Sequence, residues 1–122
     1  MAIHGLAQVA ITVADVPAVL SYYRDVMGLP FLFAPNDDLA FLQAGDVRIM
    51  LTQPQGEGES GHNSVLYFSV DQLHETYAEI VARGGIAERQ PALAAKMPDH
   101  ELWIGFLRDP EHNLIGLMQE VR

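Results

Sequence analysis

Histidine and glutamate side chains are the groups of this 122-residue chain best suited to proton transfer. Histidine changes its charge near neutral pH, and a neighbouring carboxylate can share in general acid–base catalysis. His100 is followed directly by Glu101, which makes this pair a candidate for such chemistry. The chain has no cysteine, which excludes disulfides, thiolate nucleophiles and thiolate metal sites. The remaining histidines are His4, His62, His74 and His112.

An internal repeat predicts the elements that must position these groups. Residues 7–28 and 64–84 each read as a strand followed by an amphipathic helix. Pairing Asp15, a suitable helix N-cap, with Asp71 sets an offset of 56 residues between the two copies. A repeat of this length indicates one supersecondary unit used twice.

Each copy is predicted to continue with three further strands. Alternating apolar residues predict the strands, and turn-forming residues such as Gly45-Asp46 separate them. After residues 86–89 a loop is expected to run through 96–99. The predicted fold is α+β, with two paired βαβββ units. The predicted strands are 6–13, 31–34, 39–44, 47–52, 64–70, 86–89, 101–107 and 114–119.

Length and composition predict one globular domain over residues 1–122, with units 1–55 and 64–122 joined by a linker at 54–63. Hydrophobic residues make up 49% of the chain, enough for a packed core. The start of the chain does not resemble a signal peptide, and no apolar run approaches the roughly 20 residues of a membrane span, so a cytoplasmic protein is expected. The formal net charge of −9 argues against nucleic acid and anionic membranes as partners.

Three segments together resemble one known superfamily. They are Val13-Ala14-Asp15 before the first helix, Tyr22–Leu29 at its end, and Asp109–Leu117 near the C-terminus. The chain resembles the vicinal oxygen chelate superfamily, the group of glyoxalase I, bleomycin-resistance proteins and extradiol dioxygenases. The resemblance implies a U-shaped, eight-stranded curved sheet around a central pocket, and a homodimer.

The resemblance also implies where a divalent metal would be bound in relatives that are metalloenzymes. Valine and glycine side chains cannot coordinate a metal, and a thioether does not suit hard divalent ions. One neutral amide cannot hold the ion alone. The sequence therefore predicts no metal and no cofactor. The four aligned positions carry Gln8, Met50, Val65 and Gly116.

Strand alternation and the resemblance together predict the residues that line the pocket. Arg48, if buried there, would need an anionic partner and could bind a ligand carboxylate; alternatively it pairs with Asp46 or Glu101. Gly116 is expected to leave open space. Trp103 has the opposite orientation and should cover a helix or a dimer contact. The predicted ligand-binding residues are Gln8, Arg48, Met50, Val65, Tyr67, Phe106, Gly116 and Met118.

The same alternation gives His100 its candidate role. Phe106 matches a pocket-lining position of ring-cleaving relatives, and His100 shares its strand face. This makes His100 and Glu101 the predicted catalytic residues, unless His100 only begins the strand and bonds to the backbone.

Three functions follow from these expectations. The first is metal-independent binding or sequestration of a small molecule with an aromatic or apolar body and a carboxylate, as in the bleomycin-resistance branch. The second is a metal-free lyase or isomerase that uses His100 and Glu101. The third is a metal-dependent enzyme with a non-standard site, for example one built from His62, His100 and an acid.

Overall fold

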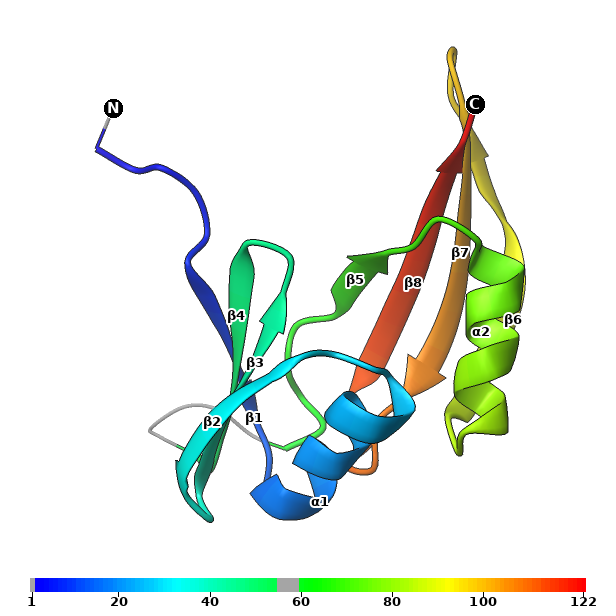
Figure 1. Ribbon diagram of the computed structural model, residues 1–122. Helices are drawn as coiled ribbons and strands as arrows, with labels where there is room; N and C mark the ends of the chain where they lie inside the picture. Colours follow the sequence, from blue (N-terminus) through cyan, green and yellow to red (C-terminus); the bar gives the residue numbers. More distant parts are fainter. Residues whose placement is uncertain (1, 55–59) are drawn as a thin grey trace. The chain divides into compact units, whose positions relative to one another are not determined.

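Two compact units make up the chain, residues 1–63 and 64–122. The computed structural model describes residues 2–54 and 60–122 (Figure 1). The middle of the predicted linker, residues 55–59, lies outside the described residues. Each unit contains one strand, one helical segment and three further strands, in that order, which confirms the predicted βαβββ pattern.

The first unit is a four-stranded sheet in the order β1-β4-β3-β2. Strand β1 runs parallel to β4, and the other neighbours are antiparallel. The helical segment starts with Asp15, whose carboxylate accepts the Ala18 N–H at 3.2 Å as predicted for an N-cap. The elements are β1 (Gln8–Thr12), α1 (Val16–Ser21), the π-helical turn η1 (Tyr22–Val26), β2 (Phe31–Asn36), β3 (Leu39–Ala44) and β4 (Val47–Thr52).

The second unit repeats this topology, with the strand order β5-β8-β7-β6. Strand β5 runs parallel to β8, and the others are antiparallel. Helix α2 packs against β6, β7 and β8 (Figure 1). The elements are β5 (Leu66–Ser69), α2 (Leu73–Ala82), β6 (Ile86–Lys96), β7 (Glu101–Arg108) and β8 (Leu114–Val121).

Each sheet has a helix-covered face and an open face. Successive strand residues point to opposite faces, so every second side chain enters the core. In the first unit the buried side chains come mainly from β1, β3, β4, α1 and η1; in the second they come mainly from β7, β8 and α2. The largest side chains that are fully buried are Tyr23, Leu42, Leu51, Leu73, Ile80, Leu107, Ile115 and Leu117.

Strand β6 corrects the sequence prediction, because it continues to Lys96 where a loop was expected after residue 89. It is an edge strand, so Pro91 costs it no hydrogen bond inside the sheet. Its register against β7 shifts at three places, which breaks the simple alternation that indicates a strand. The Met97 N–H donates to the His100 carbonyl at 2.8 Å and closes the turn into β7.

The structure also corrects the offset of the repeat. The N-caps are Asp15 and Gln72, so the units are 57 residues apart here, and Asp71 is not the counterpart of Asp15. Matching backbone bonds agree: Val13 N–H donates to Thr52, and Val70 N–H donates to Met118, each at 2.9 Å.

A pair of glutamines holds the strand-to-helix loop in both units. Gln53 donates through Nε2 to the Ala14 carbonyl at 3.0 Å. Gln119 donates likewise to the Asp71 carbonyl, and its Oε1 also accepts the Leu73 N–H at 3.0 Å. Helix α2 lacks a side-chain N-cap, so Gln119 takes over that role.

The turn between β7 and β8 is built on a buried carboxylate. Asp109 is fully buried and accepts the N–H groups of Glu111 and Asn113 and the Asn113 side-chain amide, at 2.8 to 3.0 Å. His112 has a positive φ of 68°, a conformation that glycine adopts without strain. Within the described residues, no helix is long and apolar enough to cross a membrane.

Candidate functional site

The open face of the first unit brings three predicted ligand-binding residues together. Gln8 pairs in register with Arg48, and Ala10 with Met50. Arg48 donates through Nε to Gln8 Oε1 at 2.8 Å, and Gln8 Nε2 lies 3.6 Å from the Met50 sulfur. The guanidinium carbon of Arg48 lies 5.5 Å from the centre of the Phe41 ring, a cation–π distance. The face therefore presents an oriented guanidinium above an aromatic ring.

Arg48 differs from the arginines that pair with acids. Arg24, Arg108 and Arg122 each contact a carboxylate at 2.7 to 2.9 Å. Within residues 2–54 and 60–122, no ion pair of Arg48 is found, and Asp46 of the same unit forms none with it. The predicted pairing with Asp46 is therefore not found among these residues, and the pairing with Glu101, which lies in the other unit, stays a prediction.

On the open face of the second unit, one row of residues crosses all four strands. Tyr67 of β5 pairs with Gly116 of β8, Gly116 with Phe106 of β7, and Phe106 with Arg89 of β6. The Tyr67 and Phe106 rings meet edge to face with centres 5.9 Å apart. The guanidinium carbon of Arg89 lies 5.4 Å from the centre of the Phe106 ring.

Gly116 does not leave the open space that the sequence led us to expect. A Cβ built at Gly116 would lie 2.4 Å from Cδ1 of Tyr67, so the tyrosine ring lies directly over the glycine. The space that a side chain at position 116 would need is filled from the neighbouring strand. Tyr67 can touch Phe106 because the residue between them has no side chain.

Two other predicted lining residues border this row. Met118 pairs with Ser69 on the same face, one step further along β8, and is half-buried. Val65 immediately precedes β5 and is exposed. The role of both residues in ligand binding stays a prediction.

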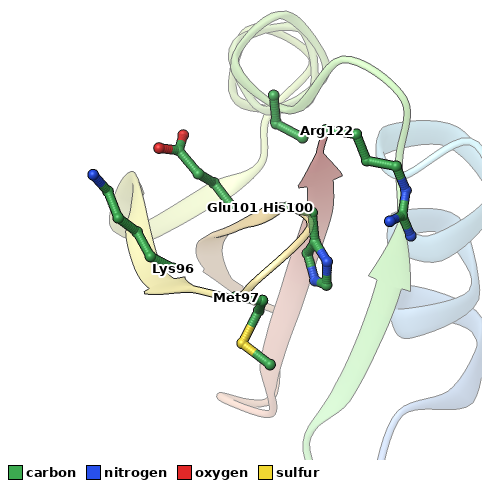
Figure 2. A pocket seen from close by; sticks show the side chains of 6 residues that line it. Lys96, Met97, His100, Glu101 and Arg122 are labelled. Atoms are coloured by element: carbon green, nitrogen blue, oxygen red, sulfur yellow. The ribbon is translucent and has the colours of Figure 1, made fainter.

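His100 and Glu101 have different partners, His100 just before β7 and Glu101 as its first residue. His100 Nδ1 contacts Asp99 Oδ1 at 2.8 Å, and its Nε2 lies 3.8 Å from Glu120 Oε1. Glu101 instead accepts the Trp103 indole N–H at 3.2 Å. Figure 2 shows the side chains of His100 and Glu101 pointing in different directions. The acids that contact His100 are therefore Asp99 and Glu120, not Glu101.

The His100 side chain lines a shallow cavity at the tip of the β6–β7 hairpin. The cavity has a volume of about 370 Å³ and also borders Lys96, Met97, Glu101, Val121 and Arg122 (Figure 2). The His100 side chain is only 15% exposed. The hydrogen bond from His100, with a second from Arg122, holds the pKa of Asp99 below its usual value.

Trp103 covers a helix, one of its two expected roles. Its ring meets that of His74 from α2 edge to face, with centres 5.6 Å apart. Tyr77, also from α2, donates its hydroxyl to the Phe106 carbonyl at 2.9 Å, and burial raises the pKa of this tyrosine. The helix therefore holds the strand that carries Phe106.

The residues at the four metal-aligned positions do not fit a divalent metal. Gln8 and Met50 hydrogen-bond to each other, Val65 has no donor atom, and the Tyr67 ring covers Gly116. The set offers one amide and one soft thioether, which hard divalent ions do not favour. Elsewhere in the described part of the chain, no three histidine or acidic side chains are grouped to hold a metal.

The sequence prediction missed three residues of the open faces, Phe33, Phe41 and Arg89. Phe41 holds the same place in the first unit as Phe106 in the second, since it pairs with Met50 as Phe106 pairs with Gly116. The repeat could have identified it. Arg89 was not identifiable, because its position depends on the register shift in β6.

Comparison with known proteins agrees with this architecture. The uncharacterized protein YraH of Bacillus subtilis is 27% identical over 92% of this chain and 95% of its own length. A probable lactoylglutathione lyase of Vibrio cholerae is 29% identical over 98% of this chain and 93% of its own. The solved structure of TnmS3, an antibiotic binding protein from Streptomyces, matches with a TM-score of 0.80 at 21% identity, covering 98% of each chain.

In addition to these similar proteins, one family model matches most of the chain, including nearly all of both units. The model of the Glyoxalase/Bleomycin resistance protein/Dioxygenase superfamily covers residues 5–117, which include both βαβββ units except the end of β8. The chain therefore belongs to the Glyoxalase/Bleomycin resistance protein/Dioxygenase superfamily.

Proposed function

We propose that the protein binds a small molecule without a metal, and that the ligand has an aromatic or apolar body and a carboxylate. Arg48 carries the proposal. Its guanidinium is exposed and oriented by Gln8 and Phe41, and it has no carboxylate partner among the described residues. In a chain with a net charge of −9, such an arginine is available to an anion.

The geometry around Arg48 suits a carboxylate. The bond to Gln8 uses Nε, which leaves the two Nη groups to face a ligand. Two parallel N–H donors match the two oxygens of a carboxylate, and such charge-assisted bonds are stronger than neutral ones.

Apolar side chains beside Arg48 suit the body of the ligand. Phe33 stacks on Phe41 with ring centres 4.7 Å apart, and Met50 pairs with Phe41 in register. Phe33 is 47% exposed, so a ligand can reach this surface. Methionine packs adaptably around irregular shapes.

The relatives support a small-molecule ligand without identifying it. TnmS3 is an antibiotic binding protein, and the Vibrio cholerae relative is a probable lyase. A polycationic antibiotic is not what Arg48 would attract. The proposal includes a cytoplasmic homodimer, as the family resemblance implies, and light scattering of the purified protein tests the dimer.

A matched pair of fluorescent probes tests the Arg48 site. Anilinonaphthalene sulfonate carries an anion, and phenylnaphthylamine is its uncharged parent. Arg48→Met should weaken binding of the anionic probe about tenfold and leave the neutral probe within about twofold, because only the former uses the guanidinium. Equal loss for both probes would contradict the proposal.

Arg24→Met is the matched control. Arg24 also lies over a ring, with its guanidinium carbon 5.9 Å from the centre of Phe31, but Asp25 already neutralises it at 2.9 Å. Its loss should leave the affinity for both probes unchanged. A decrease like that of Arg48→Met would show a general charge effect.

A metal-free enzyme is the second candidate, and the contacts of His100 favour it. The Asp99 carboxylate holds Nδ1 and leaves Nε2 towards Glu120, an arrangement that suits a general base. His100→Gln should then abolish turnover of a methylglyoxal–glutathione hemithioacetal while the melting temperature stays near that of the parent. Absence of turnover in the unaltered protein with this substrate would count against lyase activity of this type.

A further inference from the structure

We propose that His100 is the titrating element of a pH-sensitive latch, which fastens the tip of the β6–β7 hairpin to the end of β8 when the imidazole takes up a proton. The latch lies within the second unit and shares no residue with the proposed Arg48 site. It goes beyond the proposed function, because it operates without a ligand.

The latch is a ring of four side chains. His100 Nδ1 lies 2.8 Å from Asp99 Oδ1, and Arg122 donates to Asp99 Oδ2 at 2.7 Å. Arg122 also donates to Glu120 Oε1 at 3.0 Å. The last contact, between His100 Nε2 and the same Glu120 oxygen, measures 3.8 Å, which is too long for a hydrogen bond. The ring therefore lacks one bond, and that bond belongs to the histidine.

The missing bond follows from the proton that a neutral histidine lacks. An ionised Asp99 carboxylate can only accept hydrogen bonds, so the single proton of a neutral His100 ring is held on Nδ1. Its Nε2 then presents a lone pair to Glu120, and two acceptors do not bond to each other. Protonation of Nε2 makes it a donor aimed at a carboxylate, and such charge-assisted bonds are strong.

The charges around His100 favour the same direction. While the ring nitrogen is neutral, two carboxylates face one guanidinium, and the imidazolium supplies the missing positive charge. Lys96 of β6 and Glu101 of β7 also border the cavity, but within the described part of the chain no ion pair joins either of them to His100. Exposed ion pairs are usually weak, but the His100 side chain is only 15% exposed, so solvent screens its charge less.

Closing the ring fixes a turn to a strand. Asp99 and His100 lie between β6 and β7, beyond the last residue pair of the β7–β8 ladder. Glu120 and Arg122 come from the end of β8. The closed ring therefore holds one side of the shallow cavity at the hairpin tip (Figure 2).

The sign of the pH dependence follows from these groups. Histidine takes up its proton between about pH 8 and pH 5, so the latch closes as pH falls through this range and opens as pH rises. The hydrogen bonds from His100 and Arg122 keep the pKa of Asp99 below its usual value, so the carboxylate stays charged over the same range.

A double-mutant cycle at two pH values tests the latch. His100→Gln, Glu120→Gln and the double variant are unfolded with urea at about pH 5.5 and about pH 8. The coupling between the two side chains should change the unfolding equilibrium constant about threefold to tenfold at the lower pH, and less than about 1.5-fold at the higher. Equal coupling at both pH values, or none at either, would overturn the proposal.

Glu88 and Arg108 form the matched control pair. They join β6 to β7 at 2.8 Å, and neither side chain changes its charge between the two pH values. A cycle built from Glu88→Gln and Arg108→Met should therefore give the same coupling at both. A loss of coupling at about pH 8 in this pair as well would attribute the effect to pH in general and reject the latch.

Nitrogen NMR of the imidazole tests the position of the proton. Long-range proton–nitrogen spectra of the unaltered protein above about pH 8 should show the neutral His100 ring with its proton on Nδ1. A proton on Nε2 would contradict the proposal, because that tautomer could already donate to Glu120. This measurement stands even if a variant does not fold. Neither experiment involves a ligand or turnover, so failure of the latch leaves the proposed function untouched.

Discussion

The two units share a backbone topology but carry different side chains at equivalent places of their open faces. The row through the first unit is Ala10, Met50, Phe41 and Phe33, and the row through the second is Tyr67, Gly116, Phe106 and Arg89. In the first unit, β1 contributes the small Ala10 and its neighbour β4 contributes the large Met50. In the second unit, β5 contributes the large Tyr67 and its neighbour β8 contributes Gly116, which has no side chain. Only the phenylalanine is common to both. The strand hydrogen bonds therefore determine the shared topology of the two units, and neighbouring side chains determine the chemistry of each open face.

The turns that lead into the last strand also differ between the two units, from β3 to β4 in the first and from β7 to β8 in the second. The first unit uses a two-residue turn at Gly45-Asp46, where the glycine has a φ of 59°. The second uses a longer turn that Asp109 holds together from within. One turn depends on backbone freedom and the other on a buried carboxylate.

Replacing the buried aspartate should have the largest effect on stability. Asp109→Ala leaves three donors without their acceptor, two of them buried, and we expect a loss of about 3 kcal/mol in the free energy of unfolding. Asp46→Ala in the exposed turn of the first unit should change it by less than about 0.5 kcal/mol. Urea denaturation of both variants measures the difference, and similar losses would contradict the comparison.

Adding one methyl group to the glycine should reveal how closely Tyr67 fills its place. Gly116→Ala forces the ring to move and should cost about 1–2 kcal/mol. In the background of Tyr67→Ala the same substitution should cost much less, because the ring is gone. A double-mutant cycle by thermal denaturation measures the coupling, and additive effects would show that the ring already lies elsewhere.

The two aspartates aligned by sequence should behave differently. Asp15→Ala removes an N-cap and should cost about 1 kcal/mol. Asp71→Ala should have little effect, because Gln119 binds the Asp71 carbonyl rather than its side chain. Equal losses in urea denaturation would restore the offset of 56 that the sequence suggested.

The free energy of unfolding at acidic pH should depend on the contact between His100 and Asp99. Because the folded state lowers the pKa of Asp99, the carboxylate contributes stability above its ordinary pKa, and this contribution is lost as pH falls through the lowered value. The difference in unfolding free energy between the parent and Asp99→Asn should therefore shrink below about pH 4. Asp38→Asn, at an exposed turn, serves as the control. A difference that grows on acidification would have the wrong sign.

The sequence predicted the strands and their order better than the side-chain contacts on the open faces. The bounds of β3 and β4 match the prediction, because their alternation is regular and Gly45-Asp46 separates them clearly. Strand β6 was not predictable over its length, since its register shifts and its proline are tolerated only at a sheet edge.

For the candidate site, alternation identified which side chains share a face but not which ones touch. It placed Gln8, Arg48 and Met50 on one face, and their contacts agree. It could not show that Tyr67 fills the place above Gly116, because that depends on a rotamer in a neighbouring strand. His100 and Glu101 are adjacent in sequence, yet His100 precedes β7 and contacts Asp99, whereas Glu101 lies in the strand and accepts the Trp103 indole N–H.

The tyrosine over the glycine has a consequence for the order in which substitutions can accumulate. A carboxylate at position 116 would need the space that the Tyr67 ring occupies, so Gly116→Glu is penalised until the tyrosine has been replaced. Losing the tyrosine first uncovers a glycine in the middle of a sheet and removes the partner of Phe106. Each single step is unfavourable in the presence of the other residue, which makes the two positions strongly epistatic. A lineage that acquires this pair cannot regain an acidic side chain there by one substitution.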